Sequence, residues 1–264
     1  IRIAFAVALA WSMVSCSGGA NDDGASGETA HAETVATLTG LLPADARGVF
    51  AVDLAALLSG GSTEDVTALL TGEGGDPVFV KEQFAAIGAL AETIDVPGEM
   101  SSALLAQTTD GADGVFLVAK LRHETIDEVV AGSTPEPAGT YGPESRALYL
   151  DEDGNHLALL PGGLLVVGTQ PAVESVVDVA DGAESEDASA IVPFIDALDG
   201  GAHMSFVYGL PALFDDDVPP NRSLRGAAVM SGALDLVDGD LEGSVAFHTS
   251  NATDFVESYN ALNR

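Results

Sequence analysis

Residues 48–58 read GVFAVDLAALL, an apolar strand pattern that runs directly into a helical start at Ala55. Apolar side chains alternate from Gly48 to Leu54 as they do in a half-buried strand. The same character returns late in the chain, where residues 206–214 read FVYGLPALF. We therefore expect a strand that leads into a helical turn to be used twice in the fold.

Two strands and a helix are predicted after each copy of this unit. The bounds are Met100 to Gln107, Val115 to Leu121 and about Glu124 to Val130 in the first half, and Ala227 to Leu236, Leu241 to His248 and Ala252 to Leu262 in the second. The turn signals at residues 109–114 and at Asp238-Gly239 favour an antiparallel pair in each half. The repeated order of elements indicates an internal duplication.

The middle of the chain has a different pattern. Ser133 to Pro143 is rich in proline and small residues and is predicted to be a connector. A helix from Pro171 to Val179 has proline in its first turn and Thr169 as a plausible cap. Between them the pattern predicts three short strands with hairpin turns, namely Ala147 to Leu150, His156 to Leu160 and Leu164 to Val167.

These elements predict an α+β fold, a largely antiparallel sheet with helices packed on one face, built from two related halves around a central β-meander. We expect a single domain over residues 34–264, with the first half at about 34–132, the meander at about 133–200 and the second half at about 201–264. The chain has 264 residues, of which 47% are hydrophobic, so it can bury a core without disulfides.

The charge of the chain excludes two classes of partner. Nine Lys and Arg residues stand against 41 Asp and Glu, and the net charge is -32. So little positive charge cannot neutralise nucleic acid or hold the chain electrostatically on anionic lipid. Because the acids are scattered along the chain, adaptation to salty surroundings explains them better than an acidic binding site. Weak Ca²⁺ association with such a surface is expected.

The N-terminal residues predict an extracytoplasmic location. Ile1 to Ser15 form an apolar run with one early cation, Arg2, which is typical of a signal peptide. The run is shorter than the roughly 20 residues that a spanning helix needs. Met13-Val14-Ser15-Cys16 resembles the bacterial lipobox, in which the cysteine is diacylated and becomes the new N-terminus. The alternative is an ordinary secretory signal that ends beside a cysteine.

The lipobox resemblance implies a membrane anchor on Cys16. Residues 16–33 are rich in Gly, Ser and acids and are predicted to be a flexible tether. Ser17 does not resemble the aspartate that retains lipoproteins in the inner membrane, so an outer membrane is favoured if the host is Gram-negative.

Three stretches of the folded part carry a second resemblance. They are Pro43 to Leu58 (PADARGVFAVDLAALL), His156 to Val167 followed by Gly168-Thr169, and Phe194 to Leu213. They are similar to a widespread family of bacterial extracytoplasmic domains whose activity is uncharacterised. The resemblance implies the architecture and adds no catalytic residue.

The sequence predicts no catalytic residue, metal ligand or cofactor. Its one cysteine is assigned to the anchor, and no Gly-x-Ser-x-Gly elbow is present. The histidines do not have the spacing of a metal site, although His123 and His248 stand at comparable places in the two halves. All five are His31, His123, His156, His203 and His248.

Two acidic runs are candidate cation sites. Asp151-Glu152-Asp153-Gly154-Asn155 is similar to the start of a calcium loop, but no acid stands at the closing position. A tight turn between strands explains the same residues. Asp215-Asp216-Asp217 is predicted to be a solvated loop.

Together these features predict a lipid-anchored extracytoplasmic protein that serves as a non-enzymatic binding or scaffolding module, with an envelope protein as its partner. Two alternatives stay open. A large apolar cavity between sheet and helices would favour a carrier of an apolar ligand. A cleft with convergent Ser, His and Asp would favour a hydrolase.

Overall fold

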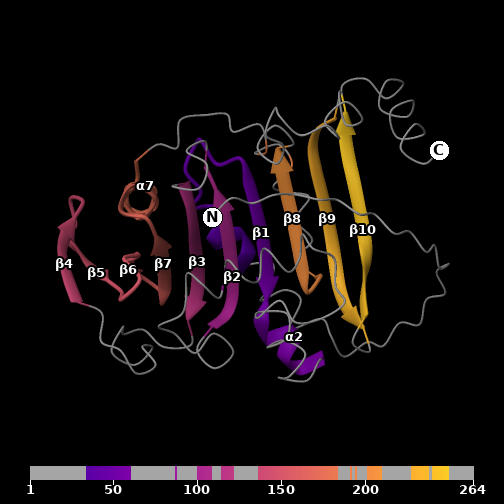
Figure 1. Ribbon diagram of the computed structural model, residues 1–264, viewed down its shortest axis with the longest axis horizontal. Coiled ribbons are helices and arrows are strands. Elements are labelled where there is room, and N and C mark those ends of the chain that lie inside the picture. Colours follow the sequence, from indigo (N-terminus) through magenta and orange to yellow (C-terminus); the bar gives the residue numbers. More distant parts are fainter. Residues whose placement is uncertain are drawn as a thin grey trace.

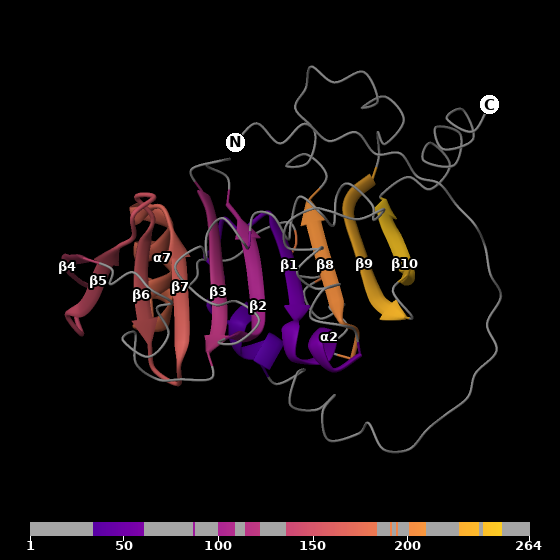
Figure 2. The ribbon, with the colours of Figure 1, turned by 60° about the horizontal axis from the view of Figure 1, so that its bottom comes forward.

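Strands dominate the fold, a sheet-rich α+β arrangement (Figures 1 and 2). The computed structural model describes residues 34–60, 87, 100–108, 114–121, 136–183, 191, 194, 201–209, 227–237 and 240–249. Its strands form one ten-stranded sheet in the order β10-β9-β8-β1-β2-β3-β7-β6-β5-β4, and each neighbouring pair is antiparallel. No helix among these residues is long and apolar enough to cross a membrane.

Except for β4, the strands follow the predicted positions closely. Their bounds are β1 Gly48–Asp53, β2 Met100–Gln107, β3 Val115–Leu121, β4 Glu136–Tyr141, β5 Arg146–Leu150, β6 His156–Leu160, β7 Leu164–Gly168, β8 Met204–Gly209, β9 Ala227–Val237 and β10 Asp240–Thr249. Helices occupy residues 34–39, Leu54–Gly60 (α2) and Gln170–Ala180 (α7). The helices predicted near residues 124–130 and 252–262 lie outside the described residues.

Three expectations need correction. The connector predicted at Ser133 to Pro143 contains β4, an exposed edge strand that tolerates Pro137 because an edge strand need not donate every N–H. β1 is buried on both faces rather than half-buried, since it is a central strand. Thr169 occupies the N-cap position of α7 but makes no side-chain capping bond.

The turn from β1 into α2 depends on Asp53. The backbone N–H of Ala56 donates to Asp53 Oδ1 at 2.9 Å, which is the bond of a helix N-cap. An aspartate can therefore end the strand and start the helix without an intervening loop, which explains why the strand and helix patterns are contiguous in residues 48–58.

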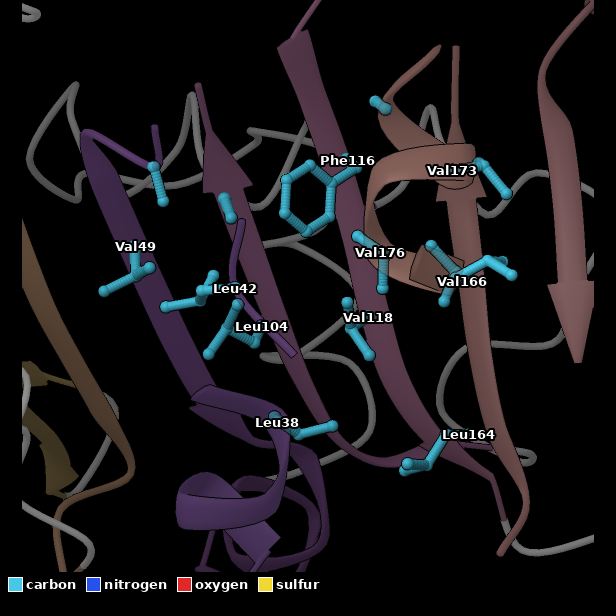
Figure 3. Close-up of a cluster of buried hydrophobic side chains, with 14 of the residues drawn as sticks. Leu38, Leu42, Val49, Leu104, Phe116, Val118, Leu164, Val166, Val173 and Val176 are labelled. Carbon is cyan, nitrogen blue, oxygen red and sulfur yellow. The ribbon is translucent and has the colours of Figure 1, made fainter. Parts of the chain in front are cut away.

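The sheet separates two apolar clusters. One face carries the cluster around Phe50, Leu105 and Leu117, which lie side by side on β1, β2 and β3. The other carries the cluster around Leu104 and Val118 (Figure 3). Burial on both faces explains why these strands read as near-continuous apolar runs.

The expectation of helices on one face is not confirmed. α2 contributes Leu54 and Leu57 to the first cluster. The helix at residues 34–39 contributes Leu38 to the second, and α7 contributes Val173 and Val176 to that same cluster (Figure 3).

The two halves pair directly with each other. β1 and β8 are antiparallel, and Phe50 lies opposite Phe206, the residue with which it aligns in the repeated sequence. Around this pair Gly48 faces Tyr208 and Val52 faces Met204, as an approximate twofold axis between the halves requires. The predicted meander is central in sequence, but β4 to β7 lie at one end of the sheet.

The outer strands of the two halves share their register and one irregularity. β2 pairs with β3 in an antiparallel ladder that shifts between Met100 and Ser102, where Ser102 faces Lys120. β9 pairs with β10 in a ladder that shifts at the corresponding place, between His248 and Thr249. A β-bulge at the same step of both ladders is a specific feature, because bulges are kept as part of a fold. The duplication itself stays a prediction from the sequence.

Truncation of the two phenylalanines at this axis tests their coupling. Phe50→Ala and Phe206→Ala are each expected to lower the free energy of unfolding by about 3–5 kcal/mol, since both side chains are buried. The double variant should lose less unfolding free energy than the sum of the two single losses, because the effects of truncating neighbouring side chains are not additive. Urea unfolding measures the free energy of unfolding of all three variants. Val237→Ala is the control, because Val237 is 44% exposed. Strict additivity would contradict direct packing of the pair.

Tyr208 makes the free energy of unfolding depend on pH in the alkaline range. Burial raises the pKa of its phenol well above the ordinary value of 10.0. The unfolded chain therefore ionises first, so the stabilisation is complete below about pH 10 and is lost as pH rises further. Tyr208→Phe should reduce the slope of the unfolding free energy above pH 10 by about 1.4 kcal/mol per pH unit. Parallel pH profiles for Tyr208→Phe and the original protein would refute this role.

Candidate functional site

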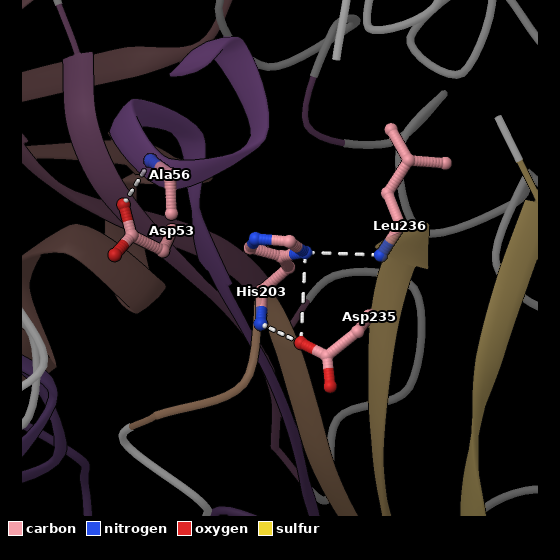
Figure 4. Close-up of polar contacts among 5 residues, drawn as sticks. All are labelled: Asp53, Ala56, His203, Asp235 and Leu236. Atoms are coloured by element: carbon pink, nitrogen blue, oxygen red, sulfur yellow. Dashed lines mark hydrogen bonds and ion pairs between the residues drawn. The ribbon is translucent and has the colours of Figure 1, made fainter. Parts of the chain in front are cut away.

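A row of polar residues crosses the sheet where β1 ends. His203 lies between Asp53 of β1 and Asp235 of β9 (Figure 4). The Asp53 N–H donates to the His203 carbonyl at 2.8 Å, and the His203 N–H donates to Asp235 Oδ1 at 2.9 Å. His203 directly precedes β8, so these bonds extend the hydrogen bonding between β1, β8 and β9 by one residue, with the Asp235 side chain as one of the acceptors.

The hydrogen bonds of His203 define its tautomer. Its Nδ1 accepts the N–H of Leu236 at 2.9 Å, so the proton of the neutral ring is on Nε2 (Figure 4). Asp235 Oδ1 lies 3.5 Å from the same Nδ1 and cannot receive a proton from it in this form. Both side chains therefore hold strands together through hydrogen bonds to the backbone.

A second polar pair lies on the same face of β9 and β10. Ser231 Oγ and His248 Nε2 are 2.8 Å apart, and the His248 ring packs against Phe194 with centroids 4.5 Å apart. A serine bonded to a histidine is the first requirement of a nucleophilic hydrolase.

The surroundings of this pair do not complete such a site. Ser231 is 6% exposed and lies within a strand rather than on a sharp turn. Among the described residues no carboxylate is hydrogen-bonded to His248. The pair can fasten β9 to β10, and its geometry alone supplies no oxyanion-binding group.

The face that carries this pair differs between the two halves. In the first half, Leu104, Phe116 and Val118 occupy it and are fully buried. The second half instead has small or polar residues there, and Ser244 and Ala246 are exposed. We call this surface the open face; it comprises the exposed Ser244 and Ala246, the half-buried Ala233 and His248, and the buried Ser231. It is the candidate binding surface of the described chain.

The loop at Asp151 is a turn. The N–H groups of Asp153 and Asn155 donate to Asp151 Oδ1 at 3.0 and 2.7 Å, and Asn155 Nδ2 donates to Asp151 Oδ2 at 2.9 Å. Gly154 has φ +87, a backbone conformation that residues with a side chain rarely adopt. Both carboxylate oxygens of Asp151 are thus occupied within the loop, which favours the turn over a calcium site.

A further polar cluster joins α7 to β4 and β5. Arg146 Nε donates to Asp181 Oδ1 at 2.7 Å, and its Nη2 contacts the same oxygen. Tyr141 donates to Asp178 Oδ2 at 3.1 Å, and this bond is the main reason that the pKa of Tyr141 is raised. The Asp181 side chain is only 3% exposed, and its Oδ2 has no hydrogen-bond partner. The cluster positions α7 against the exposed end of the sheet.

The structure places some of the sequence-predicted residues and not others. Cys16, His31, His123 and Asp215-Asp216-Asp217 lie outside the described residues. His156 lies on β6 with a buried Nδ1 that has no partner. By strand register His248 corresponds to Lys120 rather than to His123. Within the described chain no group of three His, Cys, Asp or Glu side chains could hold a metal ion.

Sequence reasoning missed the Ser231–His248 pair. The two residues are on adjacent strands and have no local motif. The predicted turn at Asp238-Gly239 was the available signal, because a two-residue turn fixes the hairpin register and brings the two residues together.

Comparison of the chain with protein-family models, curated proteins and solved structures found no match. The resemblance to a family of extracytoplasmic domains therefore stays a prediction from the sequence.

Replacement of Asp151 distinguishes a turn from a cation site. Asp151→Ala should lower the free energy of unfolding by about 1–3 kcal/mol, since it leaves three donors without their acceptor. The exposed neighbour Glu152→Ala should change it by less than about 0.5 kcal/mol. Thermal melts in Ca²⁺ and in Mg²⁺ complete the test. Stabilisation by Ca²⁺ that disappears in Asp151→Ala would instead identify a calcium site.

Proposed function

We propose that the chain is a lipid-anchored extracytoplasmic protein that acts as a non-enzymatic binding or scaffolding module of a bacterial envelope. In this proposal Cys16 carries the lipid, residues 16–33 are the tether, and the sheet presents a surface to an envelope partner. The observation that supports it best is the open face, an area of small and polar residues beside central strands that are buried on both faces.

The use of the polar side chains supports a binding role over catalysis. His203, Asp235 and Asp151 each complete a backbone ladder or turn. Arg146 and Asp181 attach a helix to the sheet. These side chains make their hydrogen bonds within the protein, whereas a catalytic group must have a polar atom directed at its substrate.

The composition of the open face suits contact with another protein. Ala246 and Ser244 have short side chains, so a partner can approach the backbone of β10 closely. Two related halves, one covered and one open, would let one half stabilise the fold while the other binds. The acidic surface would keep such a module soluble beside an anionic membrane.

Labelling of the lipid tests the anchor. The full chain, expressed with an initiator methionine in a bacterial host, should incorporate labelled palmitate and enter the detergent phase on phase separation. Cys16→Ser should abolish both, because only a thiol at this position accepts the diacylglycerol. Ser17→Ala is the matched control and should remain labelled. An unlabelled original protein, or a labelled Cys16→Ser variant, would refute the anchor.

Native mass spectrometry of the purified protein separates the binding module from the carrier. A binding module should show only the mass of one or two chains in native conditions, with nothing added to the mass per chain found in denaturing conditions. A lipid-sized mass that is lost on denaturation would favour the carrier and contradict the proposal. Ester hydrolysis that disappears in Ser231→Ala but persists in Ser244→Ala would favour the hydrolase.

A further inference from the structure

The outer edge of β10 lacks a neighbour that its counterpart has. β3, which corresponds to β10 in the first half, pairs with β2 on one side and with β7 on the other. Among the described strands β10 pairs with β9 alone and lies at the edge of the sheet (Figure 1). Residues 242–246 form a continuous exposed run. An exposed edge of this length is a template for another strand.

The ladder pattern shows which backbone groups of β10 point outward. The bonds Asp53 N–H to His203 and Gly209 N–H to Arg47, at 2.8 and 2.7 Å, mark the hydrogen-bonded pairs between β1 and β8. Because such pairs alternate along each antiparallel ladder, the pattern can be followed across β8 and β9 to β10. It leaves the N–H and C=O groups of Gly243 and Val245 directed away from β9.

The two ends of the sheet are protected differently. β4, at the other edge, carries Pro137 and a register shift beside it, both of which discourage pairing with another strand. β10 has neither proline nor lysine between Asp240 and Thr249, and Val245 is 42% exposed on it. The register shift of its own ladder lies at its end, between His248 and Thr249, so Asp240 to His248 offer a regular edge to a partner.

We propose that β10 pairs with β10 of a second copy of this chain, antiparallel, about a twofold axis at Val245. In this register Val245 faces its own symmetry mate, which buries two exposed apolar side chains. Glu242 faces His248 of the second copy twice, so each acid meets an imidazole rather than another acid. Any other register loses both pairings. The interface is isologous, as in most homodimers.

The net charge sets the condition for this dimer. Two chains of charge -32 repel each other, and salt screens that repulsion. Dimerisation should therefore strengthen as salt is raised. A contact held mainly by surface ion pairs would weaken instead.

Disulfide trapping in intact cells tests the register. The full chain with Val245→Cys should give a disulfide-linked dimer on a non-reducing gel, because the Cα atoms of a hydrogen-bonded pair, about 5.5 Å apart, suit a disulfide. Val237→Cys is the matched control, since Val237 has a similar exposure, 44% against 42%, but lies on β9. Both variants retain Cys16. No dimer for Val245→Cys, or equal dimer for both variants, would overturn the proposal.

The mass of the purified full chain in detergent gives an independent test. Light scattering should show a protein mass that doubles between low salt and about 1 M salt. Val245→Glu should stay monomeric and Val237→Glu should still double, with circular dichroism confirming that both are folded. A protein that is monomeric at every salt concentration, or dimers in both variants, would refute the β10 interface.

Discussion

The pairing of β1 with β8 is the contact on which the remaining structure depends. It joins residues 48–52 to residues 204–208 and fixes the order of the sheet, because each half adds its remaining strands outward from this pair. Phe50 and Phe206 meet at its centre in one apolar cluster. Without this contact, β1 and β8 would each have an unpaired edge. Their apolar side chains would then lack the neighbours that the other half supplies.

Most strands could be predicted because their signals are local. Alternation, apolar runs and Gly-containing turns define β2, β3, β6 and β7 to within a residue. β4 could not be predicted, since its prolines and glycines are typical of a connector and only its neighbour β5 makes it a strand. The burial of both faces of β1 was also beyond the sequence, because it depends on how the helices next to β1 in the chain, at residues 34–39 and in α2, fold back over opposite faces of the sheet.

The candidate site shows the same division. The Asp151 turn was predictable because its partners lie within four residues. The Ser231–His248 pair and the contact of His203 with Asp235 join different strands, so they depend on register, which sequence patterns specify only through the turns. The contrast between a buried face in one half and an open face in the other required the structure. It separates a surface that stabilises the fold from one on which Ser244 and Ala246 stay exposed.

The long separation between β1 and β8 also determines when the chain can fold. If the polypeptide emerges from its N-terminus, β1 and its neighbour β2 are present long before residues 204–209 arrive. During that interval one edge of β1 has no strand beside it, and non-local pairing of this kind is slow. The unpaired edge of β1 is thus open to pairing with other chains, and so to aggregation, until residues 204–209 are available.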